Sequence, residues 1–171
     1  MISEYSRPKK TGIIAINLKE GDELVSVAIA KVGEELILSS SKGQAVRFKH
    51  STVRSSGRNA QGVKGIKLRK EDYCVGMVVA EPDATLLTVC EKGYGKRTPI
   101  GPNSSVPDVP ESEIVDDAAP ETVVEVEEPA GEEDESTSSR YPTKGRGTMG
   151  VRDIKTTNRN GPVVAIAVVR D

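Results

Sequence analysis

The sequence predicts an all-β fold built from propeller-like blades, each with about four short antiparallel strands. A short phrase recurs 50 residues apart, since Lys42-Gly43 returns as Lys92-Gly93 and Arg47 returns as Arg97. Short runs rich in β-branched residues alternate with turn residues, and no window of a dozen residues keeps a helical period. A fixed period of this size is typical of arrays in which each unit needs neighbours to cover its apolar face.

A longer phrase occurs in three copies. Residues 12–16 correspond to residues 62–66, and a third copy at 150–154 begins 88 residues after the second. An acidic stretch of 40 residues, 101–140, lies between the second and third copies. Without that stretch the second interval is 48 residues, close to the first. We therefore expect repeats of one unit, with a long insertion in the last of them.

Eight short runs carry the strand signal. They are residues 11–18, 24–30, 35–40, 45–49, 63–68, 74–80, 85–91 and 163–169. Turn signals such as Ser-Lys-Gly and Glu-Lys-Gly separate them. Residues 35–80 are predicted to form one complete unit, and residues 5–30 the latter half of a preceding one. About two and a half units are too few to close a ring, so we expect an incomplete disc.

The stretch 101–140 is predicted to be a disordered acidic insertion. It carries five prolines, 13 Asp/Glu and one Arg. Such a composition cannot bury enough apolar surface to offset the chain entropy of folding. The expected organisation is therefore blades over 1–100, the insertion over 101–140, and a continued blade over 141–171.

The formal net charge of −2 hides two opposed parts. The insertion has a net charge of −12, whereas the remainder holds 23 Lys/Arg and 13 Asp/Glu, a net charge of +10. A basic folded part points to an anionic partner. The competing interpretation is that these cations are ordinary solvated strand faces.

Cations recur at the same part of each unit, so stacked units would align them in one stripe. In residues 45–49, Val46 and Phe48 fall on one face of the expected strand and Arg47 and Lys49 on the other. The candidate binding residues are Lys9, Lys10, Arg47, Lys49, Arg54, Arg58, Lys64, Lys67, Lys96, Arg97, Lys144, Arg146, Arg152 and Lys155.

Contact with the backbone of duplex DNA is the interaction that this composition favours. Single-strand binders stack bases on aromatic side chains, but this chain has four Tyr and one Phe, and Phe48 is expected in the core. No helix is evident that could enter a major groove. Lys and Arg along a curved rim would instead neutralise phosphates and bend the duplex, with little reading of sequence.

The sequence shows no constellation for catalysis, for a metal or for a cofactor. His50 is the single histidine, which excludes a Ser-His-Asp triad and a multi-histidine metal site. Residues 145–150 match G-x-G-x-x-G, but no buried strand precedes them and no helix follows. Cys74 and Cys90 lack C-x-x-C spacing and are expected to be reduced core residues.

The chain is expected to be cytosolic. Its longest apolar run, 163–169, is far shorter than the roughly 20 residues that span a bilayer. Its first residues do not resemble a secretory signal. We therefore expect no membrane partner.

Several phrases resemble the C-terminal domain of the DNA gyrase A subunit. They stand at residues 4–8, 12–18, 21–24, 46–48, 62–66 and 93–98, and then at 141–144, 150–151 and 158–161. The resemblance covers nearly everything except the acidic insertion. It implies a β-pinwheel, a disc of four-stranded blades whose basic rim wraps a DNA segment. Within gyrase, that wrap biases the ATP-driven enzyme toward negative supercoiling.

The resemblance also implies the partners and the setting. They are double-stranded DNA, the rest of the gyrase A subunit and the gyrase B subunit, in the bacterial cytoplasm and associated with the nucleoid. No small-molecule substrate and no cofactor is expected for this chain itself. The topoisomerase IV counterpart is an alternative, although Gly-Tyr-Gly-Lys-Arg at 93–97 favours gyrase. A propeller-like platform for protein interactions is a rival of another class.

Three departures from the family pattern stand out. The 171 residues show no counterpart of the breakage-reunion domain, so we expect that Tyr5, Tyr73, Tyr94 and Tyr141 do not inherit the role of its catalytic tyrosine. The basic "gyrase box", rich in glutamine and glycine, is not visible, and a full disc has five or six blades. The acidic insertion leads to a hypothesis that it folds over the basic rim and competes with DNA; the alternative is a tolerated solvated loop.

Overall fold

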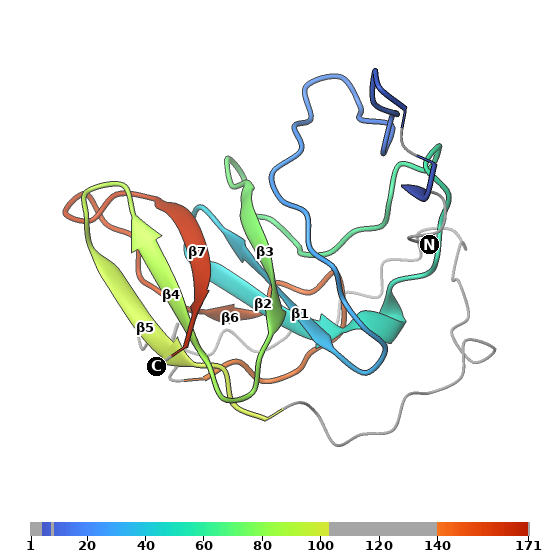
Figure 1. Ribbon diagram of the computed structural model, residues 1–171. Coiled ribbons are helices and arrows are strands. Elements are labelled where there is room, and N and C mark those ends of the chain that lie inside the picture. The colour runs from blue at the N-terminus through green and yellow to red at the C-terminus, as the bar shows by residue number, and fades with distance from the viewer. Residues whose placement is uncertain (1–4, 8, 103–139, 171) are drawn as a thin grey trace, which may run out of the picture.

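Seven strands in two antiparallel sheets make up the described part of the computed structural model (Figure 1). The structure describes residues 5–7, 9–102 and 140–170, so most of the predicted acidic insertion lies outside it. The predicted all-β class and its antiparallel sheets are confirmed. One 3₁₀ turn, His50–Thr52, follows the second strand and contains the single histidine. In the described ranges, no helix has the length and apolar character needed to span a bilayer.

The first sheet has four strands in the order β3–β1–β2–β6. β1 (Glu35–Ser40) and β2 (Gln44–Lys49) form a hairpin, and β3 (Cys74–Ala80) pairs with the other edge of β1. β6 (Val151–Arg152) comes from beyond the insertion and pairs with β2. The prediction that residues 35–80 form a complete unit is therefore wrong in one respect, because the fourth strand belongs to the next repeat.

The second sheet repeats the first with one strand fewer. β5 (Gly95–Pro99), β4 (Thr85–Cys90) and β7 (Val163–Val169) follow the order β5–β4–β7. The pairing of β1 with β3 shifts at Ser39/Ser40, and the pairing of β4 with β7 shifts at Val89/Cys90, which is 50 residues later. The sequence repeat is thus a repeat of strand register, with β4, β5 and β7 in the places of β1, β2 and β3.

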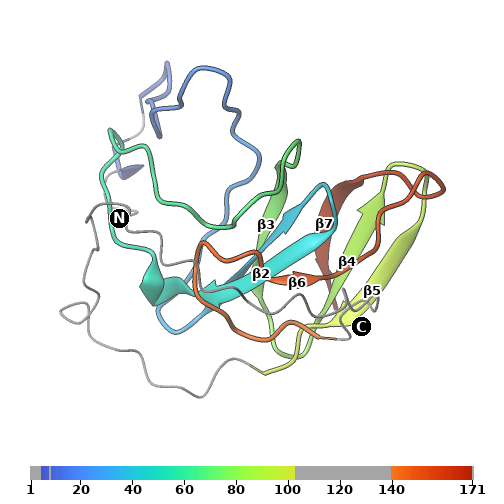
Figure 2. The ribbon, with the colours of Figure 1, turned by 180° about the vertical axis from the view of Figure 1, so that it is seen from behind.

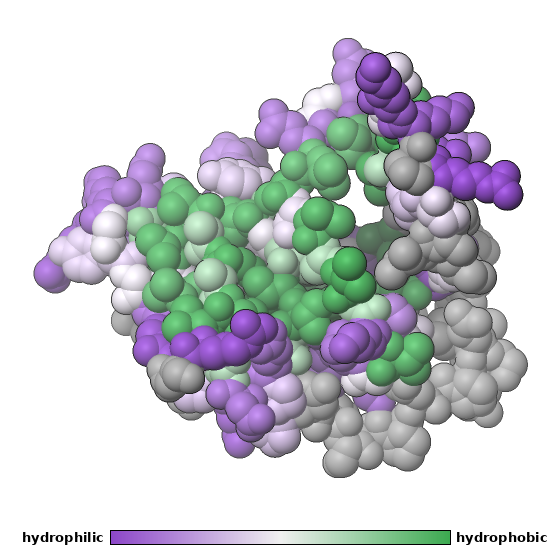
Figure 3. All heavy atoms as spheres, in the orientation of Figure 1, coloured by the Kyte–Doolittle hydropathy of each residue, from purple (hydrophilic) through white to green (hydrophobic). Residues whose placement is uncertain are grey.

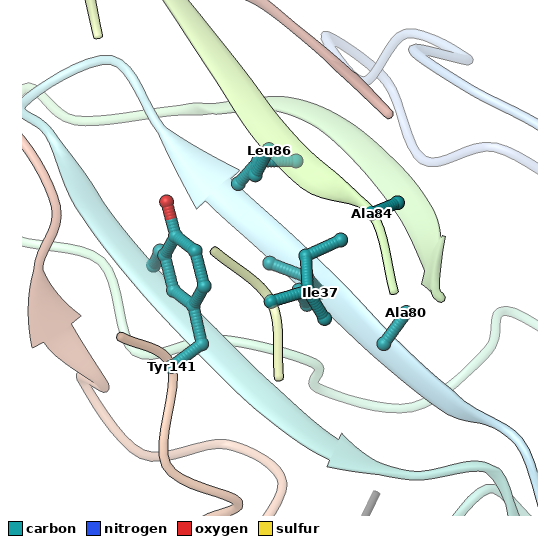
Figure 4. Packing of buried hydrophobic residues seen from close by; sticks show 7 residues of the cluster. Ile37, Ala80, Ala84, Leu86 and Tyr141 are labelled. Atoms are coloured by element: carbon teal, nitrogen blue, oxygen red, sulfur yellow. The ribbon is translucent and has the colours of Figure 1, made fainter. Parts of the chain in front are cut away.

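Apolar side chains form two clusters on the two faces of the β1–β2 hairpin. The first includes Ile37, Leu86 and Tyr141 and lies between the sheets (Figure 4). The second contains Leu36, Val46, Phe48 and Ile66. Both faces of this hairpin are therefore buried, which fixes its register because a slip of one residue would exchange the faces.

The hairpin turns recur as closely as the strands. Gly43 and Gly93 each donate a backbone hydrogen bond three residues back, to Ser40 and Cys90, and both have a positive φ that favours glycine. The Asp72 carboxylate accepts hydrogen bonds from the Ser40 and Ser41 hydroxyls and from the Lys42 backbone N–H. Partial burial acts to raise the pKa of Asp72, but these hydrogen bonds outweigh it and lower the pKa.

Three predicted strands, 11–18, 24–30 and 63–68, are not strands in the structure. The first two keep large apolar side chains in solvent; Ile14 is 70% exposed and Val27 is 86% exposed. A strand satisfies its backbone polar groups by pairing with a neighbour. No described strand pairs with these segments, so their strand-like sequence stays unpaired.

The two sheets meet through β3 and β7, the terminal strands on one side of each sheet. Figure 3 shows apolar side chains gathered over this side of the molecule. Val164 of β7 is one exposed apolar residue there, at 48% exposure. The opposite terminal strands are β6 and β5. The molecule therefore has an apolar side, where β3 and β7 meet, and an opposite side formed by β5 and β6.

Candidate nucleic-acid interface

Residues 141–155 lie along β2 and form the side of the first sheet away from β3 (Figure 2). Thr143 forms a parallel bridge with Arg47, and the Lys144 N–H donates to the Arg47 carbonyl at 2.7 Å. Farther along, β6 pairs with Gln44 and Ala45. The segment is thus held to the sheet by its backbone, which leaves the Lys144 side chain exposed.

Gly150 permits the close approach of this segment to β2. Its φ is +79°, and a Cβ at this position would lie 2.0 Å from the Ala45 carbonyl oxygen. A side chain is therefore excluded by both backbone conformation and space. This glycine positions the cations that flank it along the sheet.

Arg146 ties this segment to the preceding repeat. Its Nε donates to the Thr52 carbonyl at 2.9 Å and its Nη1 to the Lys64 carbonyl at 2.6 Å. The Lys67 N–H donates to the Thr148 carbonyl at 2.9 Å. Lys64, Lys67 and Arg146 therefore gather at the junction of two repeats, and the Lys64 and Lys67 side chains are exposed.

The same contact recurs at the preceding junction. Arg58, which corresponds to Arg146, donates from Nη1 to the Ile14 carbonyl at 2.9 Å, and Ile14 corresponds to Lys64. A polar cavity of about 550 Å³ at this junction is lined by Arg7, Lys9 and Arg58, among others. The structure therefore places an arginine, Arg58 or Arg146, at the equivalent position of two successive junctions, with lysines nearby at positions that are not equivalent.

Arg47 does not belong to an exposed basic face. Its side chain is only 2% exposed, and its Nε lies 2.6 Å from the Glu35 carboxylate. The guanidinium also donates to the carbonyls of Ile100 and Tyr141, and to those of Gly101 and Pro102. The expectation that Arg47 contacts DNA is wrong, because the second face of β2 is covered by residues 100–102 and 141–143.

The guanidinium of Arg47 instead joins the two ends of the acidic insertion. Its acceptors are Ile100 just before the insertion, Gly101 and Pro102 at its start, and Tyr141 just after it. Glu35 strengthens the junction, because its other carboxylate oxygen accepts from the Thr143 hydroxyl at 2.9 Å. Both charges are buried, but each has several polar partners, which is the condition under which a buried pair is tolerated.

The remaining candidates are spread over the molecule. Lys10, Arg54, Arg97 and Lys155 are exposed, whereas Lys49 and Arg152 are half-buried. Lys96 is also half-buried, and its Nζ donates to the Asp153 carbonyl at 2.7 Å. The predicted single stripe is thus reduced to two clusters at the repeat junctions, with these other cations outside them.

Asp153 forms a buried polar centre between the sheets. Its carboxylate accepts hydrogen bonds from the Tyr141 hydroxyl at 2.7 Å and from the Thr88 hydroxyl, and its backbone N–H donates to Gly43. Burial first, and then the Asp153 charge, raise the pKa of Tyr141 far above its usual range. Tyr141 is therefore a neutral hydrogen-bond donor that holds residues 141–153 in place.

Sequence reasoning overlooked the cations at the hairpin tips. The Nζ of Lys42 donates to the Lys70 carbonyl, and the Nζ of Lys92 donates to the Asn158 carbonyl. Each lysine thus ties its hairpin turn to the loop that precedes the next strand of the same sheet. Arg159 lies 5.2 Å from the centre of the Tyr94 ring and donates to the Tyr94 hydroxyl. The Lys-Gly phrase of the repeat was the signal that could have identified the two lysines.

Within the described ranges, no group of three or more His, Cys, Asp or Glu side chains is placed to hold a metal ion. Cys74 and Cys90 are free thiols at the ends of β3 and β4. Burial raises the pKa of both thiols, which favours the protonated, unreactive form. The chemistry that the described residues support is electrostatic binding by the cations at the repeat junctions.

The family model for the DNA gyrase C-terminal domain, a beta-propeller, matches residues 2–31, 34–81, 84–107 and 137–170. The DNA gyrase A subunit of Salmonella typhimurium is 39% identical over 170 residues, which are 99% of this chain and 15% of the relative. The corresponding protein of Escherichia coli K12 is 34% identical over 171 residues, with shares of 100% and 15%. The chain therefore spans about 15% of the length of these relatives.

Two solved structures are also similar. A DNA gyrase A C-terminal domain superposes with a TM-score of 0.61 at 27% identity, covering 94% of this chain and 42% of that domain. The C-terminal domain of DNA topoisomerase IV gives a TM-score of 0.69 at 21% identity, with coverage of 99% and 42%. The second likeness shows the fold alone.

Proposed function

The chain belongs to the DNA gyrase C-terminal domain family, and from this premise we propose that it binds double-stranded DNA and supports its wrapping. The observation that carries the proposal is an arginine contact that recurs at successive repeat junctions, with a lysine beside it at each. Arg146 and Lys64 lie at one junction, and Arg58 lies with Lys9 at the junction before it. Cations that repeat with the fold would follow a regular array of phosphates.

Binding through the phosphate backbone is the mechanism that these side chains support. Lysine and arginine that neutralise phosphates release counterions, which gives affinity without sequence information. Exposed aromatic side chains are few: Tyr5 is 43%, Tyr73 is 57% and Tyr94 is 43% exposed. Three separate rings are a poor platform for stacking successive bases. Duplex DNA is therefore favoured over single strands.

In the holoenzyme, we propose that this module acts with the rest of the gyrase A subunit and with the gyrase B subunit. The wrapped duplex would be presented to the ATP-driven enzyme and bias it toward negative supercoiling. The bacterial gyrase A relatives support this assignment, and DNA as partner implies the cytoplasm and the nucleoid. The topoisomerase IV counterpart is the alternative within the same class.

The experiment is a measurement of duplex affinity against salt concentration, on two duplexes of unrelated sequence. We expect the logarithm of the association constant to fall linearly with the logarithm of salt, by about 0.9 for each phosphate neutralised, and equally for both duplexes. Affinity that differs strongly between the two sequences would contradict backbone binding. Absence of salt-dependent binding would contradict the proposal as a whole.

A second candidate is a platform for protein interactions. The apolar side chains exposed beside β3 and β7 favour it, because large exposed apolar patches mark interaction surfaces (Figure 3). This function predicts partner binding that is insensitive to salt and weak affinity for DNA. The same titration therefore separates the two functions.

A further inference from the structure

The turns of the two hairpins and the loop before β7 meet at one end of the sheets (Figure 1). The Val163 N–H donates to the Ser41 carbonyl at 2.8 Å. The Glu91 N–H donates to the Pro162 carbonyl at 2.9 Å. The loop before β7 is therefore bonded to equivalent turns of two successive repeats. This end of β2 is opposite to the end that leads to Thr52 and the repeat junction.

A cavity of about 400 Å³ lies among these three segments. Lys42 lines it from the first turn, Lys92 lines it from the second, and Thr156 and Thr157 line it from the loop. Its volume is many times the roughly 30 Å³ that one water occupies, so a ligand of several non-hydrogen atoms fits. The cavity shares no lining residue with the cavity at the repeat junction. It is therefore a separate candidate site.

Both lysines keep unused hydrogen-bond donors. The Lys42 ammonium makes one described hydrogen bond, to the Lys70 carbonyl. The Lys92 ammonium likewise makes one, to the Asn158 carbonyl. An ammonium has three N–H donors, so two remain on each lysine. Because the acceptors are neutral carbonyls, they position the two ammonium groups without neutralising their charge.

The charges that line the cavity favour an anion. Glu91 is the one carboxylate among the lining residues, against the two lysines, which gives a net charge of +1. The Asp72 carboxylate does not line the cavity, and it is engaged by the Ser41 hydroxyl and the Lys42 backbone N–H. Two ammonium groups in one cavity attract an anion that can contact both of them.

Phosphate is the anion that this arrangement favours. Its oxygens point in tetrahedral directions, so donors from two turns and a loop can reach it together, whereas a carboxylate accepts in one plane. Lysine binds phosphate as a compact point charge. A threonine hydroxyl can donate to an oxygen that the lysines leave free.

We infer that this cavity, the tip site, binds a phosphate group between the ammonium groups of Lys42 and Lys92. The hydroxyl of Thr156 donates to the same group from the loop. The inference does not rest on the proposed DNA binding, because a free phosphate is sufficient as ligand. The phosphate belongs either to a duplex backbone or to a free phosphorylated compound, and these two sources are separated below.

The test uses the full chain and inorganic phosphate, at neutral pH and at an ionic strength kept constant with chloride. We expect saturable shifts of the amide NMR signals of residues 41–42, 91–92 and 156–158. Lys92→Gln should raise the dissociation constant by about tenfold, because it removes a charge-assisted donor. Glu91→Gln should lower the constant by about threefold, because it removes a like charge from the lining.

Two neighbouring residues supply matched controls. Lys70→Gln and Glu71→Gln make the same changes of charge on exposed side chains that do not line the cavity. Both should leave the dissociation constant within about twofold of the parent chain, because solvent and salt screen exposed charges. A loss of structure would not make Glu91→Gln bind more tightly. Circular dichroism of all four variants checks that the sheets persist.

The source of the phosphate follows from duplex affinity against salt in the Lys92→Gln variant. A decrease of about 1 in the slope of log affinity against log salt would identify a backbone phosphate as the ligand. An unchanged slope, with phosphate binding that persists in the presence of duplex, would identify a free phosphorylated compound. Both results agree with the tip site. A chain that fails to bind duplex would contradict the proposed function and leave the phosphate titration unaffected.

Three outcomes would overturn the inference. The first is the absence of saturable phosphate binding. The second is an equal change of affinity in Lys92→Gln and Lys70→Gln, which would indicate a general effect of net charge. The third is a hexaglutamate peptide that displaces phosphate, binds more tightly than phosphate and loses affinity in Lys92→Gln, since an acidic protein segment would then be the ligand.

Discussion

Residues 24–30 and residues 74–80 hold the same place in successive repeats, but only the second segment is a strand. β3 pairs with β1, whereas no described strand pairs with residues 24–30. Both segments are rich in valine and alanine, so intrinsic preference does not separate them. Strand formation in this chain is therefore decided by the neighbouring repeat.

The same difference holds for single residues, because several positions of the repeat are covered by a neighbouring segment in one copy and uncovered in the other. Arg47 is covered by residues 100–102 and 141–143, whereas Arg97 is exposed. Gly150 lies directly against the β2 backbone, whereas a Cβ on Gly62 would have open surroundings. Asp72 fastens a hairpin turn, whereas Asp22 is exposed. Each pair supplies a variant and its matched control.

The largest effect is expected for Arg47→Leu against Arg97→Leu. Loss of Arg47 leaves Glu35 as an uncompensated buried charge and removes the donor to four carbonyls, so the free energy of unfolding should fall by about 3–5 kcal/mol. Arg97→Leu should cost about 0.5 kcal/mol, because its side chain is exposed. Urea denaturation followed by circular dichroism measures both variants. Similar losses of unfolding free energy would contradict the difference between a buried Arg47 and an exposed Arg97.

Gly150→Asn against Gly62→Asn comes next. Asparagine tolerates a positive φ better than most residues, so the variants isolate the effect of space. At position 150 the new Cβ meets the Ala45 backbone, and we expect a loss of about 3 kcal/mol in unfolding free energy. At position 62 we expect about 1 kcal/mol or less. Equal midpoints in urea would show that the close approach of residues 145–152 to β2 is wrong.

Asp72→Asn against Asp22→Asn gives a smaller effect that depends on pH. Because the folded-state pKa of Asp72 is lowered, its contribution is present above the pKa of the unfolded chain and is lost as pH falls through the folded-state pKa. At neutral pH, Asp72→Asn should cost about 1 kcal/mol, discounted for partial exposure, and the difference from the parent chain should shrink in acid.

Asp22→Asn should stay within about 0.5 kcal/mol of the parent chain at every pH, since its side chain is exposed. Thermal or urea unfolding curves over the acid range measure both variants. A cost for Asp72→Asn that stays constant down to the lowest pH would contradict the role given to its carboxylate.

Much of the fold was predictable from the sequence because the strands recur at the same interval as the repeated sequence phrases. The bounds of β1, β3 and β7 agree with the predicted runs, and those of β2 and β4 differ by one residue. β6 was not predictable in this way, because two residues carry no period of their own. Its position depends on Gly150 and on the edge of β2 that does not pair with β1, which are features of tertiary structure.

The candidate site was predictable in composition but not in position. Alternation in residues 45–49 put Arg47 opposite Val46 and Phe48, as the structure has it, but alternation does not say whether the second face is solvated. Residues 100–102 and 141–143 cover that face, and they lie more than 50 residues away in the chain. The junction pairing of Arg146 with Lys64 likewise depends on contacts between repeats.

The most direct test of the proposed DNA binding is the salt dependence of duplex affinity in two double variants of equal charge change. Lys64→Gln/Lys144→Gln removes exposed cations at a repeat junction, and Lys19→Gln/Lys31→Gln removes exposed cations outside both junction clusters. We predict that the first double variant lowers the slope of log affinity against log salt by about 2 and that the second leaves it nearly unchanged. An unchanged slope in the first, or an equal decrease in both, would contradict a DNA interface at the repeat junctions.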